Sequence, residues 1–139
     1  MDDPSSQSFF EQYQALTTAA GLADFSGRTQ LELTGADRAT FLHSFCTNEI
    51  RKLPIGQGCE AFITDNKGGI LGYVYVFCGP ESLVLETTAG QAERLSKHLD
   101  RYIIREKVEI HDRSDEWSEL LLVGPSSQGP QCCRCLFST

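Results

Sequence analysis

The fold of this chain is decided by its central stretch, Cys59-Glu-Ala-Phe-Ile-Thr-Asp-Asn-Lys-Gly-Gly-Ile-Leu-Gly-Tyr-Val-Tyr-Val-Phe-Cys78. Residues 70–78 are rich in β-branched and aromatic residues, which predicts a long strand, and residues 59–64 predict a shorter one. Between them, residues 65–69 supply the Asp, Asn and Gly of a tight connection. A phosphate-binding loop is the alternative, but the Gly-Lys-Ser/Thr ending and a following helix are absent. The stretch therefore predicts a β-hairpin.

Further strands and helices are predicted on both sides of this hairpin. Strand patterns occur at residues 22–25, 30–34, 82–87, 108–111 and 119–123. Apolar residues at helical spacing predict helices over residues 8–20, 37–46 and 91–102. Ser8 and Glu11 have the spacing of a capping box at the start of the first helix. Because strands and helices do not alternate as regular β-α-β units, we predict an α+β fold with a largely antiparallel sheet and flanking helices.

Composition limits the classes of partner. The chain has 139 residues and a formal net charge of −7, and its length suits one domain, which we place at residues 1–125. Its 12 Lys and Arg residues are scattered, so we expect no nucleic acid partner. No stretch is long and apolar enough to span a bilayer, and the N-terminus does not have the pattern of a secretory signal. We therefore expect no membrane partner and a cytoplasmic location.

The six cysteines raise the questions of disulfides and of metal binding. A reducing cytoplasm favours thiols, and we expect Cys46 and Cys59 to be buried or unreactive, with Cys78 likewise. Residues 126–139 have neither strand nor helix pattern, which predicts a disordered tail, either natural or the product of a shifted reading frame. Cys132, Cys133 and Cys135 in this tail lack the paired spacing that closes a four-ligand shell, so we expect no metal site.

The residues alone predict no catalytic site. None of the serines lies in a Gly-x-Ser-x-Gly elbow, and the three histidines fall in unrelated predicted elements. Asp112, Asp115 and Glu116 cluster near a strand. Such a cluster fits acid–base work by paired carboxylates or, more commonly, a solvated acidic loop.

Several motifs in sequence carry a resemblance to a known family. They are Leu-Glu-Leu-Thr-Gly-Ala-Asp-Arg-Ala-Thr-Phe-Leu at residues 31–42, Cys-Thr-Asn-Glu-Ile at 46–50, Leu-Pro-Ile-Gly-Gln-Gly at 53–58, Gly-Gly-Ile-Leu at 68–71 and Tyr-Ile-Ile-Arg-Glu-Lys-Val-Glu-Ile at 102–110. No single motif is specific, but their order and spacing are. Over residues 16–125 the chain resembles the T-protein (aminomethyltransferase) of the glycine cleavage system and its YgfZ-type relatives in iron–sulfur cluster assembly.

The resemblance implies a domain that binds tetrahydrofolate or a folate derivative, with Tyr73, Tyr75 and Glu86 at the binding positions. In T-proteins the Gly-Gly-Ile-Leu element is followed by two aspartates, one of them catalytic, whereas this chain has Gly72 and Tyr73. Glu86 lies in the strand where T-proteins have a folate-contacting asparagine. Both departures favour the YgfZ-like branch, which implies a folate-binding module with no catalytic residue and an iron–sulfur client protein as partner.

Two alternatives remain open at this point. One is an aminomethyltransferase fragment that takes its carboxylate from elsewhere, such as Asp65. The other is a folate-binding interaction domain that forms a homodimer, as in tRNA-modifying GTPases. Family members are at least about twice as long as this chain, so the resemblance implies an incomplete folate-binding unit.

Overall fold

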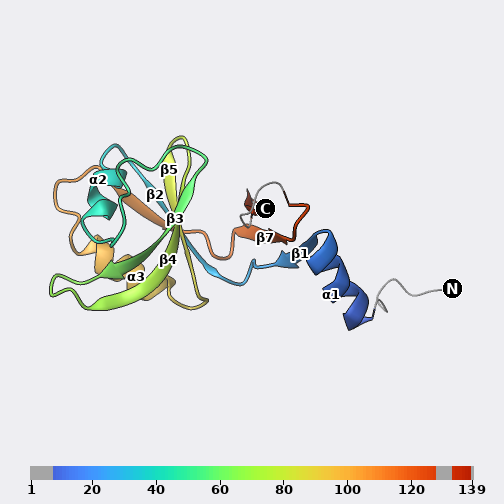
Figure 1. Cartoon of the computed structure of the whole chain (residues 1–139). Coiled ribbons are helices and arrows are strands. Elements are labelled where there is room, and N and C mark those ends of the chain that lie inside the picture. Colours follow the sequence, from blue (N-terminus) through green and yellow to red (C-terminus); the bar gives the residue numbers. More distant parts are fainter. Residues whose placement is uncertain (1–7, 128–132, 139) are drawn as a thin grey trace. The chain divides into compact units, whose positions relative to one another are not determined.

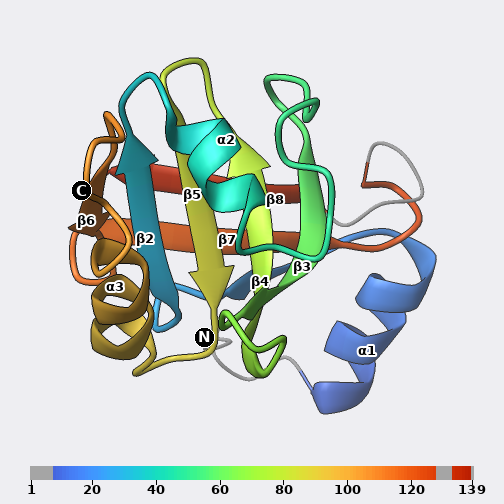
Figure 2. The same ribbon diagram turned by 90° about the vertical axis from the view of Figure 1, so that its left-hand side faces the viewer.

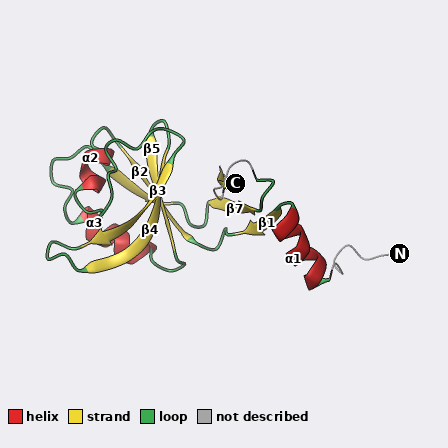
Figure 3. Cartoon of the chain, viewed as in Figure 1, coloured by secondary structure: helices red, strands yellow, loops and turns green. Residues whose placement is uncertain are grey.

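The computed structural model describes residues 8–127 and, for the backbone alone, residues 133–138. Helices and strands alternate irregularly along the chain (Figures 1 and 3). The helices are α1 (Phe9–Thr18), α2 (Arg38–His43) and α3 (Ala92–Asp100). The strands are β1 (Gly21–Asp24), β2 (Thr29–Thr34), β3 (Gly58–Thr64), β4 (Ile70–Cys78), β5 (Ser82–Thr87), β6 (Glu109–Asp112), β7 (Trp117–Val123) and β8 (Cys133–Ser138).

These elements form two compact units, whereas the sequence predicted one domain over residues 1–125. The larger unit is Gly27–Asp115, and the smaller one joins Met1–Ser26 to Glu116–Thr139. The division follows from strand pairing, because β1 from the start of the chain pairs with β7 near its end. A pairing between segments so far apart in sequence leaves no mark on local composition.

The larger unit is a five-stranded sheet with two helices on one face. Its strand order is β3-β4-β5-β2-β6, and every neighbouring pair is antiparallel. Both α2 and α3 cover the same face of this sheet (Figure 2). The α+β prediction with a largely antiparallel sheet is confirmed.

The hairpin at residues 65–69 is held by its first residue. The Oδ1 atom of Asp65 accepts hydrogen bonds from the N–H groups of Lys67 (2.8 Å) and Gly69 (2.7 Å). Gly68 has a φ of 81°, a left-handed conformation that glycine adopts without strain. The hairpin prediction is confirmed. Two of the amides that a phosphate-binding loop would present are already bonded to the Asp65 carboxylate.

Alternation along the strands builds the core between the sheet and the helices. Val74 and Val76 on β4 are fully buried, as are Leu31 on β2 and Leu85 on β5. From α3, the buried pair Leu95 and Leu99 joins the same cluster, four residues apart and thus on one helix face. Each fully buried leucine stabilises the fold by about 1.5–3 kcal/mol. The helix predicted at 91–102 is confirmed.

Helix α2 ends three residues earlier than predicted. The sequence favoured a helix over 37–46, and the regular helix covers Arg38–His43. Beyond it, the N–H groups of Ser44 and Phe45 bond to carbonyls three residues back, at 3.1 and 3.0 Å, which tightens the final turn. Cys46 then forms a bridge with Ile63 of β3. Pairing with the sheet therefore replaces the last helical turn.

The smaller unit contains an unpredicted strand. Its sheet has the order β1-β7-β8, and β8 runs antiparallel to β7 over Trp117 to Leu122. The prediction of a disordered tail over residues 126–139 was wrong for Cys133–Ser138, because backbone pairing with β7 forms a strand where the local pattern gives no signal. Residues 128–132 and 139 lie outside the described residues.

Helix α1 forms as predicted, but its apolar side chains are exposed. The capping box is confirmed: Ser8 Oγ accepts from the Glu11 N–H (3.3 Å), and the Glu11 side chain accepts from the Ser8 N–H (3.0 Å). Phe9, Phe10 and Tyr13 are 85%, 69% and 57% exposed. The helical pattern is therefore correct, and none of the helix residues is buried.

Gly35 is required by a close backbone approach, which gives a testable stability prediction. It has a φ of 102°, and a Cβ added there would collide with the carbonyl oxygen of Lys107. Gly56 has a φ of 83° with no atom within 4 Å of an added Cβ. Gly56→Ala should lower the free energy of unfolding by about 1–2 kcal/mol, the cost of left-handed backbone alone. We expect a clearly larger loss for Gly35→Ala, because the added Cβ also collides with Lys107. Urea denaturation followed by circular dichroism measures both, and equal losses would contradict the packing at Lys107.

Candidate functional site

The three residues that the family resemblance singled out lie on the sheet face turned away from α2 and α3. Tyr73 and Tyr75 alternate along β4 with Val74 and Val76 of the core. Glu86 on β5 is the direct register partner of Tyr75. The structure therefore brings all three together on one face, with Tyr75 and Glu86 side by side. Their role in binding stays a prediction.

Aromatic rings dominate the β3–β4 part of this face. Tyr73 is 45% exposed, and its ring centroid lies 5.5 Å from that of Phe62 on β3. The rings of Tyr75 and Phe77 lie 4.8 Å apart. Rows of tilted aromatic rings present apolar faces to which a flat heterocycle can stack.

Glu86 is occupied by an ion pair. Its side chain is only 1% exposed, and it pairs with the Arg28 guanidinium, which is 27% exposed. A second pair on the same sheet joins Arg113 to Glu32 at 3.0 Å. Because a carboxylate is costly to bury without a partner, the first role of Glu86 is in this buried pair. A ligand that contacts Glu86 would have to share its carboxylate with Arg28.

The two positions of the family's aspartate pair face in opposite directions. A Cβ added at Gly72 would lie 3.6 Å from the Leu95 side chain of α3, so position 72 faces the helices. Tyr73, the next residue, faces the other side of the sheet. A ligand on either face can therefore meet a side chain from only one of the two positions.

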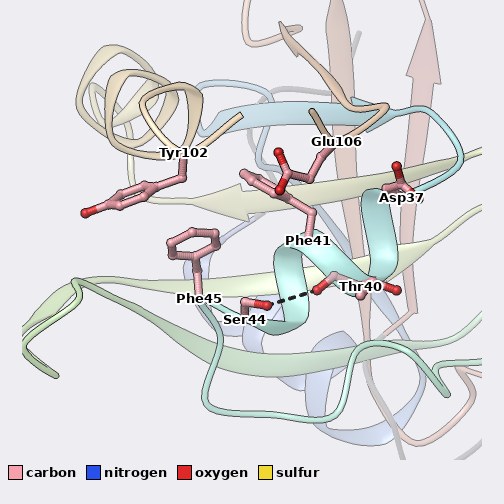
Figure 4. A pocket seen from close by; sticks show the side chains of 7 residues that line it. All are labelled: Asp37, Thr40, Phe41, Ser44, Phe45, Tyr102 and Glu106. Atoms are coloured by element: carbon pink, nitrogen blue, oxygen red, sulfur yellow. Dashed lines mark hydrogen bonds between the residues drawn. The ribbon is translucent and has the colours of Figure 1, made fainter. Parts of the chain in front are cut away.

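A pocket of about 450 Å³ lies beside α2 and was not predicted (Figure 4). The aromatic part of its lining is Phe41, Phe45 and Tyr102. Its two carboxylates serve the backbone: Asp37 accepts from the Lys107 N–H, and Glu106 accepts from two loop amides. These amides lower the pKa of Glu106 below its usual range. The acidic groups of this pocket therefore hold the loop before β6.

A second pocket, of about 530 Å³, lies between α3 and the hairpin. Its lining includes the cations Lys67, Arg94, Lys97 and Arg101, and Tyr102 lines both pockets. Sequence reasoning missed it, although the spacing of residues 94, 97 and 101 puts three cations on one helix face.

The predicted thiols are present, and burial suppresses their ionisation. Cys46, Cys59 and Cys78 are free and half-buried. Loss of solvent, with a smaller contribution from Cys59, raises the pKa of the Cys46 thiol to about 12. Burial also raises the pKa of Cys59. A thiol that stays protonated at neutral pH is a poor nucleophile, so we assign these two cysteines to packing.

Within residues 8–127, no three His, Cys, Asp or Glu side chains are grouped so as to hold a metal ion. Cys132 lies outside the described residues, and only the backbone is described at Cys133 and Cys135. The absence of a metal site in the tail therefore stays a prediction. None of the described helices has the length and apolar character needed to cross a membrane.

Known proteins resemble this chain in sequence and in fold. A model of the GCVT N-terminal domain family matches residues 3–129. An aminomethyltransferase of Bacillus cytotoxicus is 29% identical over 120 residues, covering 86% of this chain and 32% of that protein. One from Rubrobacter xylanophilus is 28% identical over 117 residues, covering 84% of this chain and 32% of that protein. The chain thus spans about a third of the length of these curated relatives.

Two solved structures share the fold. Glycine cleavage system aminomethyltransferase T from Bartonella henselae superposes with a TM-score of 0.71 at 21% identity, covering 83% of this chain and 32% of that one. Heterotetrameric sarcosine oxidase from Corynebacterium sp. U-96 gives 0.53 at 21% identity, covering 84% and 57%. Since the family model matches most of the length of this chain, the chain belongs to the GCVT N-terminal domain family.

Proposed function

We propose that this chain forms one wall of a tetrahydrofolate-binding site in a protein of the aminomethyltransferase type. The family model and the names of the curated relatives support this assignment. The observation that carries it is the aromatic sheet face, where Tyr73 and Tyr75 lie next to the buried Glu86. A folate has a flat pterin ring, which suits stacking on such rings.

The catalytic carboxylate of such a site is not supplied by this chain in our proposal. Position 72 has no side chain, and position 73 carries a phenol. Asp65, the substitute considered from the sequence, has its Oδ1 atom held by two hairpin amides and lines the pocket beside α3. It therefore lies apart from Tyr73 and Tyr75, which face the other side of the sheet.

A second candidate is the YgfZ-type role, in which a folate-binding module assists an iron–sulfur client protein. Gly72 and Tyr73 favour it, because they replace the aspartate pair. The names of the relatives favour the aminomethyltransferase type instead, and we place that assignment first.

A third candidate is an interaction domain that pairs with a second copy. The exposed Phe9, Phe10 and Tyr13 of α1 favour it, since an apolar helix face gains stability when a partner covers it. A size measurement in solution separates the monomer from the dimer.

Calorimetric titration of tetrahydrofolate into residues 1–139 tests the proposal. We expect weak binding. Tyr73→Ala should make the binding free energy less favourable by about 0.5–1.5 kcal/mol, the usual contribution of an aromatic stack. Tyr13→Ala is the matched control, because it removes another exposed tyrosine from α1. Equal losses in both variants, or no heat with the unchanged chain, would count against the aromatic face. Tight stoichiometric binding would mean that this chain already holds a complete site.

A further inference from the structure

We propose that the pocket between α3 and the β3–β4 hairpin binds an organic anion with two acidic groups about 10 Å apart, the length of two helical turns. Arg94 and Arg101 mark the two ends of the pocket. Arg94 lies in the first turn of α3, and Arg101 is its C-cap, seven residues later. Lys97 lies between them, and Lys67 faces them from the hairpin. Arginine binds carboxylate and phosphate groups through paired N–H donors, so each end can hold one acidic group.

The charge of the whole chain makes this pocket distinctive. The chain has 19 acidic and 12 basic residues, yet four of the basic residues line this one cavity of about 530 Å³. Among the described residues, Asp65 is the only acidic one in its lining. A local excess of positive charge on a chain of net negative charge attracts anions and raises their association rate.

Ordinary helix electrostatics do not account for the cluster. Lys97 in the last turn and Arg101 at the C-cap do stabilise the helix end, where the backbone carbonyls are exposed. Arg94, however, lies in the first turn, where a positive charge is unfavourable. The spacing also puts Lys97 beside Arg94 and Arg101, and like charges three or four residues apart destabilise a helix. A ligand that neutralises them would offset both penalties.

Three of the four cations are available to a ligand. Lys97 is paired with Glu93 at 2.5 Å. Among the residues that the structure describes, no ion pair within 4.0 Å involves Lys67, Arg94 or Arg101. The one lining carboxylate, Asp65, is bonded to hairpin amides through Oδ1.

The uncharged part of the lining explains why the anion should be organic. Leu71 lines the pocket as the extra residue of a β-bulge, because Ile63 pairs with Gly72 and Thr64 with Ile70. Tyr102 and His98 also line the pocket, with ring centroids 5.3 Å apart. His98 Nε2 lies 3.2 Å from the Thr64 carbonyl oxygen, which fixes its ring. An inorganic ion would leave the Leu71 side chain and the two rings uncovered, whereas a carbon linker between two acidic groups would contact them.

This inference does not rest on the proposed folate site. The pocket lies on the α3 side of the sheet, and Tyr73 and Tyr75 lie on the opposite face. Either site can fail its test without affecting the other.

Titration of residues 1–139 at low salt with three probes tests the inference. The probes are nonanedioate, hexane-1,6-diyl bisphosphate and inorganic phosphate. We expect one or both of the two-headed probes to bind at least about tenfold more tightly than phosphate, since a second charge-assisted contact is gained. The preferred probe tells a dicarboxylate source from a bisphosphate source. Equal affinity for all three, or no binding, would overturn the proposal.

Paired variants test the location. Arg94→Gln with Arg101→Gln should weaken the two-headed probe by about tenfold or more, because both end contacts are lost. Arg51→Gln with Arg105→Gln removes the same charge from exposed positions outside the pocket and should leave the affinity unchanged within about twofold. All four arginines are exposed, so the variants should keep the circular dichroism spectrum of the unchanged chain. An equal loss in the control pair would reduce the effect to net charge and reject the site.

Discussion

Residues 1–139 alone are expected to transfer no methylene group from an aminomethyl-loaded H-protein to tetrahydrofolate. In the proposed function this chain supplies one wall of the site. Gly72 and Tyr73 occupy the positions of the family's aspartate pair. A positioned acid or base accelerates a reaction by roughly a hundredfold to ten-thousandfold, so its loss is a large deficit in rate. The measurement is methylene-tetrahydrofolate formation, with a full-length aminomethyltransferase as the positive control. Turnover above the buffer rate would defeat the non-catalytic assignment.

Restoring the aspartates one at a time should not rescue the reaction, and the two variants should fail differently. Gly72→Asp directs a carboxylate toward Leu95 on the helix side of the sheet. Burying a charge there carries an effective penalty of roughly several kcal/mol. Tyr73→Asp leaves the new carboxylate on a position that is 45% exposed. We therefore expect a clear loss of stability in the first variant and a folded, inactive protein in the second. Activity in either one would mean that this chain holds the rest of the site.

The hairpin and α3 could be predicted because their signals are local. Asp65 and the two glycines after Lys67 encode the turn, and the spacing of Leu95 and Leu99 encodes the helix face. The same local pattern overextended α2, because the bridge between Cys46 and Ile63 of β3 ends the helix. Local periodicity reports which backbone form a segment prefers, and it does not report which distant strand competes for the last turn.

Strand β8 and the basic pocket could not be predicted for a related reason. Strand β8 follows a stretch of turn residues, and its backbone bonds come from β7. In the pocket, three cations were visible on one helix, but Lys67 comes from a hairpin some distance away along the chain. The candidate folate residues were brought to one face by simple alternation. The ion pair that occupies Glu86 was not foreseeable, because Arg28 lies before β2 and pairs with it across the sheet.

That ion pair leads to the second large prediction, which concerns stability. Removing one partner of a buried pair leaves an uncompensated charge and costs about 3–5 kcal/mol. We therefore expect Arg28→Met, which removes the cation paired with Glu86, to lower the free energy of unfolding by up to that amount. The matched control is Arg113→Met, whose partner Glu32 is 16% exposed and can be solvated more easily. Urea denaturation followed by circular dichroism measures both losses.

The double variant Arg28→Met with Glu86→Leu separates the charge from the packing. If the cost of the single variant comes from the carboxylate that has lost its paired cation, replacing both partners by apolar residues of similar volume should restore most of the lost stability. A double variant as unstable as Arg28→Met would show instead that the guanidinium makes contacts beyond Glu86 that the fold requires. Because Glu86 is next to Tyr75 on the proposed binding face, the same variant also tests whether Glu86 contributes to folate binding. Unchanged weak folate binding in a stable double variant would remove Glu86 from the binding residues and leave the two tyrosines.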